Sequence, residues 1–206
     1  MPNVAAIEAL ERLREGNRRF VDNDRTLGGL LRHAAELAAG QRPSAIILGC
    51  SDSRVPAELV FDQGFGDLFV IRVAGNIVAP SQVGSVEFAA ELFGTQLVVV
   101  LGHSQCGAIV ATLEQLRKPS KMKSHNMLSI VDRVRPSVEE LLSPGMSWRD
   151  EDLVSHAVRA NVRASANQLR HGSDILERLI RKGELLVVGA EYSLETGVVE
   201  FFDGVP

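Results

Sequence analysis

The sequence AIILGCSDSR, residues 45–54, decides the fold of this chain. Its first half, Ala45–Gly49, is an unalternating apolar run, which is typical of a strand covered on both faces of a parallel sheet. A polar segment, Cys50–Arg54, follows directly. The same arrangement returns in LVVVLGHSQCG, residues 97–107, where an apolar run leads into a second polar segment. The chain therefore repeats a buried strand followed by a polar loop that carries a cysteine.

Further runs complete the predicted sheet. Leu68–Arg72 and Leu185–Val188 are also continuous and apolar, and Val198–Phe202 is expected to be an edge strand after a turn at Glu195–Gly197. Helices are expected at residues 81–93, after Cys106, within 127–142 with an interruption at Pro136, at 150–170, and from the cap Ser173 to Gly183. This alternation predicts an α/β fold: an open, mostly parallel sheet of about four strands plus an antiparallel edge strand, with helices on both faces.

Residues 1–40 are expected to form a helical N-terminal arm on a single domain that spans residues 1–206. Ile7, Leu10 and Leu13 recur at helical spacing. A second helix, Leu27–Ala39, is expected to end at Gly40. The apolar face of the first helix is compatible with packing on its own subunit or on a partner.

Composition excludes several classes of function. The chain has 26 acidic and 22 basic residues and a net charge of −4, so we expect no nucleic-acid partner. The longest apolar run, Leu97–Leu101, is much shorter than the roughly 18 residues of a membrane span, so we expect no membrane contact. Glu8 and Glu11 fall where a secretory signal would be apolar, which predicts a cytoplasmic protein.

The two polar loops contain both cysteines of the chain, Cys50 and Cys106. Ligands of open α/β sheets bind beyond the carboxyl ends of the strands, so a site is expected where these loops meet. Cys50, His103 and Cys106 would suit zinc and would leave a fourth position open to water or substrate. Two other interpretations stay open: unrelated cysteines beside a polar histidine, and a catalytic thiol with His103 as its base.

Asp52 and Arg54 alternate with Cys50 along the first loop. If this loop is extended, the three side chains point to one side, and Arg54 can pair with Asp52 and keep it ionised. Asp52 would then either accept a hydrogen bond from a zinc-bound hydroxide or bind the zinc itself. The alternative is an ordinary surface ion pair.

These motifs resemble those of the β-class carbonic anhydrases. CSDSRVP, residues 50–56, matches the family's C-x-D-x-R block, and GHSQCG, residues 102–107, matches its H-x-x-C block. The similarity covers roughly residues 40–202 and includes GDLFVIRVAGN (66–76), GSVEFAAELFG (84–94) and GELLVVGAEYSLETGVVEFF (183–202).

The resemblance implies a carbonic anhydrase, a zinc lyase that reversibly hydrates carbon dioxide to bicarbonate and a proton. One zinc ion per subunit would be bound by Cys50, His103 and Cys106, and by Asp52 as well in a closed state. Otherwise the Asp52–Arg54 pair would orient the zinc-bound hydroxide.

Three further residues match the family by their position relative to the motifs, and a fourth, Gly107, is singled out by its place at a helix start. Phe69 and Phe88 correspond to residues that line the apolar pocket, and Gln41 corresponds to a glutamine that bonds substrate. Gly107 begins a helix whose amides favour negative charge nearby. The resemblance also implies a homodimer or homotetramer with active sites at subunit interfaces.

Three rival functions remain. A hydrolase of carbonyl sulfide or carbon disulfide would share every zinc residue and would differ in pocket access. An inactive zinc-binding or regulatory module would need neither Asp52 nor Arg54. A thiol-redox enzyme would be expected to carry a C-x-x-C motif, which this chain lacks.

Overall fold

The computed structural model describes residues 4–26, 37–118, 124–143 and 146–206, and its centre is a five-stranded sheet. The strands are β1 (Ala45–Gly49), β2 (Leu68–Arg72), β3 (Leu97–His103), β4 (Leu186–Tyr192) and β5 (Val199–Asp203). Their order across the sheet is β2-β1-β3-β4-β5. The first four strands run parallel and β5 runs antiparallel to β4, so the predicted fold class is confirmed.

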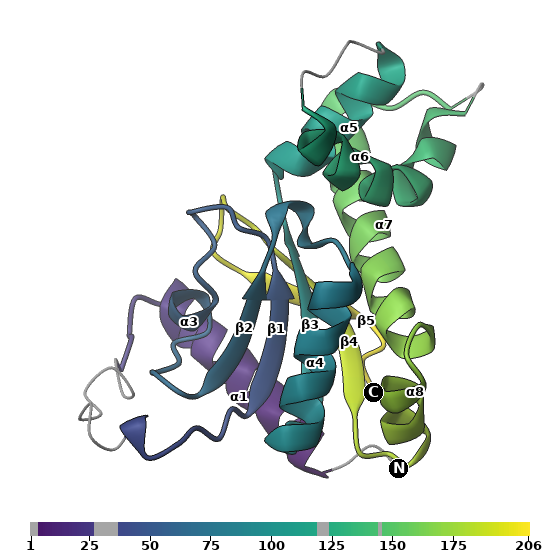
Figure 1. Cartoon of the computed structure of the whole chain (residues 1–206). Helices are drawn as coiled ribbons and strands as arrows, with labels where there is room; N and C mark the ends of the chain where they lie inside the picture. Colours follow the sequence, from purple (N-terminus) through teal and green to yellow (C-terminus); the bar gives the residue numbers. More distant parts are fainter. Residues whose placement is uncertain (1–3, 27–36, 119–123, 144–145) are drawn as a thin grey trace.

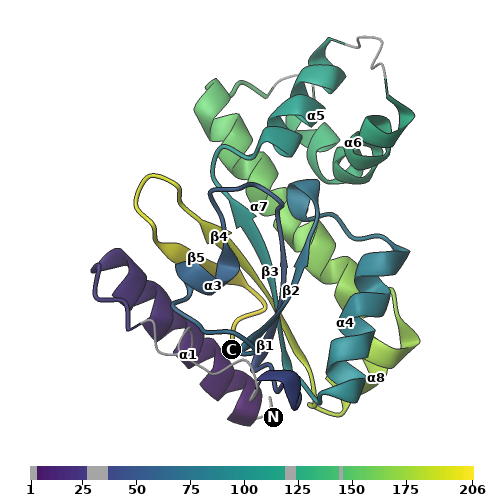
Figure 2. The same cartoon turned by 60° about the vertical axis from the view of Figure 1, so that its left-hand side comes forward.

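Helices cover both faces of this sheet (Figures 1 and 2). The described helices are α1 (Val4–Val21), α3 (Ala57–Val60), α4 (Pro80–Leu92), α5 (Gly107–Arg117), α6 (His125–Val138), α7 (Asp150–His171) and α8 (Asp174–Arg181). Short 3₁₀ turns lie at η1 (Ala74–Asn76) and η2 (Glu139–Leu142). One face packs against α1 and α3, and the other against α4, α7 and α8. Beyond the carboxyl ends of the parallel strands, α5 and α6 pack with the first turns of α7.

Successive side chains of β1 enter two different hydrophobic cores. Ile47 packs in the core that contains Leu10 of α1, whereas Ile46 packs in the core that contains Val162 of α7. Because both faces are covered, all five residues of β1 are buried. This burial explains why the strand is an unbroken apolar run instead of an alternating one.

The two central strands are longer than the sequence predicted. β3 continues past Leu101 to His103, and β4 continues past Val188 to Tyr192. The predicted strands stopped where a glycine follows the apolar run, but the β3–β4 ladder passes through both glycines.

These glycines, Gly102 and Gly189, let α7 lie close to the sheet. A Cβ atom added at Gly102 would lie 2.5 Å from Cγ2 of Val162, and one added at Gly189 would lie 2.8 Å from Cγ1 of the same valine. Glycine is therefore needed at these two positions, because any side chain would push α7 away from the sheet.

The first N-terminal helix is confirmed as α1, and it packs on the sheet of its own chain. Leu10 and Leu13 are buried in the core shared with β1 and β3. The second predicted helix, Leu27–Ala39, lies mostly outside the described residues. Its described end is helical at Leu37–Ala38, and Gly40 follows with a positive φ of 145°.

The predicted interruption at Pro136 comes two residues later. α6 continues through Pro136 to Val138, where the backbone leaves helical geometry at φ −122°. Val134 and Val138 are both buried in the core shared with α5 and α7, and this packing holds the helical course past the proline. None of the helices in the described part of the chain combines the length and apolar character needed to cross a bilayer.

The close approach of α7 predicts that Gly102→Ala destabilises the fold, because the new Cβ would collide with Val162. Overpacking of this kind costs about 1–3 kcal/mol. Val162→Ala removes the colliding methyl groups, so the double variant should lose less stability than the two single changes sum to. Urea unfolding of the metal-free protein measures this coupling.

Gly84→Ala is the matched control, since a Cβ at this position in α4 meets nothing within 4 Å. It should leave stability unchanged or raise it by up to about 1 kcal/mol. Strictly additive losses in the Gly102→Ala, Val162→Ala double variant would contradict the proposed contact.

Candidate metal centre

The ladder between β1 and β3 brings the two polar loops together. Gly49 pairs with Leu101 across this ladder, so both loops leave the sheet side by side at the carboxyl ends of the strands. The predicted ligand atoms of Cys50, His103 and Cys106 all lie within 4.8 Å of one another, and all three residues are buried. The structure thus unites the three predicted metal ligands.

The imidazole of His103 is set up as a metal ligand. Its Nδ1 atom lies 2.8 Å from the carbonyl oxygen of Ser104, and because a carbonyl only accepts, Nδ1 carries the proton. Nε2 therefore presents a lone pair. This atom is buried and has no hydrogen-bond partner among the described residues, a costly state that a bound cation would relieve.

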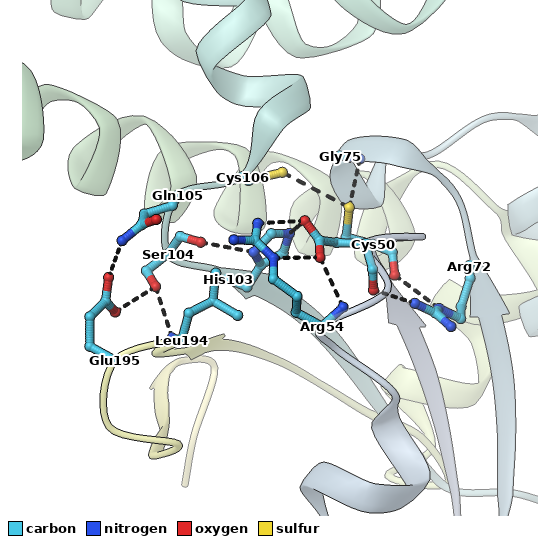
Figure 3. A network of polar contacts seen from close by, with 11 residues as sticks. Cys50, Arg54, Arg72, Gly75, His103, Ser104, Gln105, Cys106, Leu194 and Glu195 are labelled. Carbon is cyan, nitrogen blue, oxygen red and sulfur yellow. Dashed lines mark hydrogen bonds and ion pairs between the residues drawn. The ribbon is translucent and has the colours of Figure 1, made fainter.

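The two thiols form a close pair. Sγ of Cys50 lies 3.9 Å from Sγ of Cys106 and accepts a hydrogen bond of 3.3 Å from the Gly75 N–H (Figure 3). The hydrogen bond between the thiols lowers the pKa of Cys50 and raises that of Cys106, whose burial raises it further. One thiolate thus forms readily, and a dication that displaces the second proton fits this donor set.

Asp52 and Arg54 form the predicted pair through two parallel hydrogen bonds. Nε of Arg54 donates to Oδ1 of Asp52 at 2.9 Å, and Nη2 donates to Oδ2 at 2.7 Å. These bonds hold the pKa of the Asp52 carboxyl well below its usual range. Oδ2 also lies 3.9 Å from Nε2 of His103, so the carboxylate lies beside the predicted metal ligands.

The backbone of this loop forms a turn and is not extended as predicted. The Val55 N–H donates to the Asp52 carbonyl at 3.1 Å, which closes a turn, and the Arg54 N–H donates to Oδ1 of Asp52 at 3.0 Å. The ion pair forms because this turn folds the two side chains together.

Arg72, at the end of β2, fixes the loop from its other side. Its Nε donates to the carbonyl of Cys50 at 3.0 Å, and Nη2 donates to the carbonyl of Asp52 at 2.6 Å (Figure 3). The guanidinium therefore holds two backbone positions of the loop that supplies both a ligand and the carboxylate.

Glu195, a residue outside the predicted site, holds the loop between the other two ligands. Its carboxylate accepts hydrogen bonds from Oγ of Ser104 at 2.8 Å and from Nε2 of Gln105 at 2.5 Å (Figure 3). Gln105 has a left-handed backbone with φ 54°, a conformation that needs such support. Glu195 lies in the turn between β4 and β5, and no local motif marks it.

The remaining predicted residues divide into two groups. Gly107 begins α5 directly after Cys106, beside the metal-binding group. Phe69 on β2 and Phe88 on α4 stack with ring centroids 6.3 Å apart, and Gln41 lines a cavity of about 460 Å³. Phe69 lies three positions before Arg72, the last residue of β2. It is therefore roughly 10 Å along the strand from the carboxyl ends of the strands, where the predicted metal ligands lie.

Phe93 connects the members of this second group. Its ring centroid lies 5.6 Å from that of Phe88 and 6.0 Å from that of Phe69, and it lines the same cavity as Gln41. The roles predicted for Gln41, Phe69, Phe88 and Gly107 remain predictions.

Comparison with known proteins gives a consistent result. The family model described as carbonic anhydrase matches residues 45–199. Carbonic anhydrase 2 of Mycobacterium tuberculosis is 39% identical over 198 residues, which cover 96% of this chain and 93% of that protein.

Solved structures agree with this match. The Coccomyxa β-carbonic anhydrase in complex with acetazolamide is 26% identical, with a TM-score of 0.72 over 94% of this chain and 84% of that one. One of two tetrameric β-carbonic anhydrases from Sordaria macrospora is 25% identical, with a TM-score of 0.69 over 82% and 84% of the two chains.

The guanidinium of Arg54 predicts a pH effect on Asp52. In the wild type, Asp52 should stay ionised as the pH falls to 4, whereas Arg54→Gln should return its pKa toward the ordinary value of about 3.9. Because the folded-state pKa is depressed, the stability that this pair contributes is present above the unfolded-state pKa. It is lost as the pH falls through the folded-state pKa. Carboxyl ¹³C shifts follow the titration.

Asp152 provides a matched control, since Arg149 binds it through the same two-bond geometry on α7. Arg149→Gln should raise the pKa of Asp152 and leave Asp52 unchanged. An unaltered Asp52 titration in Arg54→Gln would show that the pair does not hold in solution.

Proposed function

The chain belongs to the β-class carbonic anhydrases, and from this premise we propose that it hydrates carbon dioxide reversibly to bicarbonate and a proton at a zinc site. The observation that carries the proposal is the buried Cys50–His103–Cys106 group with its unpartnered imidazole nitrogen. When bound there, zinc would supply the Lewis acidity that lowers the pKa of water to near neutrality.

The protein's own ligands support zinc over other common ions. Two thiolates balance the double charge of the ion, and thiolate with imidazole is a donor set that zinc prefers. Three protein ligands match the pattern of catalytic zinc sites, in which substrate or water takes the remaining position.

Asp52 would act on the water molecule that attacks carbon dioxide. Because Arg54 keeps the carboxylate ionised, Asp52 accepts a hydrogen bond and fixes the direction of the attacking oxygen's lone pair. Arg54 is then a positioning residue. For Asp52 to bind the metal directly, as the closed state requires, its two bonds to Arg54 would have to open.

We propose further that the chain assembles as a homodimer or homotetramer through the edge of the sheet formed by β2 and α4. β2 is one of the two edge strands, and large apolar side chains are exposed near it at Phe65, Phe88 and Leu92. A second copy covering this face would bring Gln41, Phe69 and Phe88 toward a partner's metal centre. Carbon dioxide is apolar, so the pocket beside that centre needs apolar lining residues.

Asp52→Asn separates catalysis from metal binding. The variant should keep one zinc per chain while kcat/KM for carbon dioxide hydration falls on the order of 100-fold, because the neutral amide is a weaker acceptor and places an NH₂ donor where Asp52 has a second acceptor oxygen. Cys106→Ser should lose both zinc and activity. Stopped-flow hydration assays and metal analysis of reduced protein measure the two effects.

Asp152→Asn is the control, since it disrupts an arginine pair of the same geometry at the start of α7. It should leave zinc content and rate unchanged. Absence of zinc from carefully reduced wild-type protein would overturn the proposed function, and full activity of Asp52→Asn would remove the carboxylate from the mechanism.

Leu92→Glu tests the assembly, because Leu92 on α4 is 66% exposed in the single chain. A charge buried in an interface is costly, so the variant should sediment at a lower molecular mass than the wild type. Met127→Glu, at a 56% exposed methionine on α6, should not change the mass. A monomeric wild type at micromolar concentration would refute the proposal.

A further inference from the structure

The 3₁₀ turn Ala74–Asn76 carries the N–H group that bonds a metal-binding sulfur. Gly75 donates to Sγ of Cys50 at 3.3 Å. Gly75 and Asn76 both have left-handed backbones, with φ of 72° and 43°. Asparagine tolerates this conformation better than other non-glycine residues, but it remains less stable than the right-handed form, so contacts from outside the turn help to hold it.

Two side chains of α7 supply such contacts. Nδ2 of Asn161 donates to the carbonyl of Gly75 at 2.8 Å, and Oγ of Ser165 donates to the carbonyl of Asn76 at 3.0 Å. The two residues lie four positions apart and therefore share one face of the helix. Asn161 is 2% exposed and Ser165 is 5% exposed, so water cannot readily replace either bond.

The position of α7 is itself fixed against the strand that carries another ligand. Val162, the neighbour of Asn161, fits over Gly102, which directly precedes His103. On its other side the turn is confined by α5, because a Cβ at Gly75 would lie 3.0 Å from Cβ of Ala108. The turn is thus held between α7 and the helix that follows Cys106.

We propose that Asn161 and Ser165 are positioning residues of the metal centre. Through the carbonyls of Gly75 and Asn76 they keep the Gly75 N–H directed at Sγ of Cys50. A hydrogen bond from an N–H group stabilises a thiolate. Asn161 and Ser165 therefore determine how tightly Cys50 binds a metal, although neither side chain contacts the metal itself. The inference rests on the metal site proposed above and assigns α7 a part in it.

The test measures metal retention and the electronic state of the sulfur, not activity alone. In Asn161→Leu, zinc should pass to a chromogenic chelator about tenfold faster than in the wild type, because the turn loses its buried anchor. In the cobalt-substituted protein, the thiolate-to-cobalt absorption band should move to longer wavelength, because a thiolate without its N–H donor is easier to oxidise. Ser165→Ala should show the same two changes, at smaller size.

Leu169→Ala is the matched control for helix destabilisation. Leu169 is fully buried on α7, one helical turn beyond Ser165, and packs in the core between α7 and the sheet without a hydrogen bond to the turn. It should lower the urea midpoint while zinc release and the cobalt band stay at wild-type values. Ser165→Ala carries the test if Asn161→Leu does not fold.

The outcomes separate this inference from the proposed function. If the wild type binds zinc but Asn161→Leu and Ser165→Ala release it no faster than Leu169→Ala does, the positioning role is wrong and the metal site stands. If the cobalt band stays at the wild-type wavelength in both Asn161→Leu and Ser165→Ala, the positioning role is likewise wrong and the metal site stands. If the reduced wild type binds neither zinc nor cobalt, both proposals fall.

Discussion

The parallel ladder between β1 and β3 sets the position of the whole candidate metal centre. Because Gly49 pairs with Leu101, the loops after these strands leave the sheet side by side, and two sulfurs distant in sequence come within 3.9 Å. The ladder is buried on both faces, so the geometry of a polar site depends on hydrophobic burial in the sheet below it. Polar contacts from Arg72 and Glu195 then refine the position of each loop.

Hydrophobic patterning predicted the strands and the end of the sheet at which the candidate site lies. Apolar runs that end in polar loops mark the carboxyl ends of parallel strands. This patterning ended β3 and β4 too early. A glycine that ends a strand and a glycine that admits a neighbouring helix look alike in sequence. Only the packing of Val162 against Gly102 and Gly189 distinguishes the two cases.

The Cys50–His103–Cys106 group and the Asp52–Arg54 pair were predictable because they lie in two short contiguous motifs. Asn161 and Glu195 were not, since each reaches the site by tertiary packing and bonds a carbonyl or a loop side chain. Local sequence carries no sign of such a contact. The roles proposed for Gln41 and Phe69 would depend on how two copies of the chain meet, which no local pattern encodes.

His103 and Cys50 are separated by an entire strand–helix–strand unit, so the three donors converge only once the sheet has assembled. The unfolded chain offers a cation no comparable site. By thermodynamic linkage, an ion bound there stabilises the native state in proportion to the logarithm of its free concentration relative to its dissociation constant. With a metal at the proposed site, the free metal concentration would thereby help to set the fraction of chains that are folded.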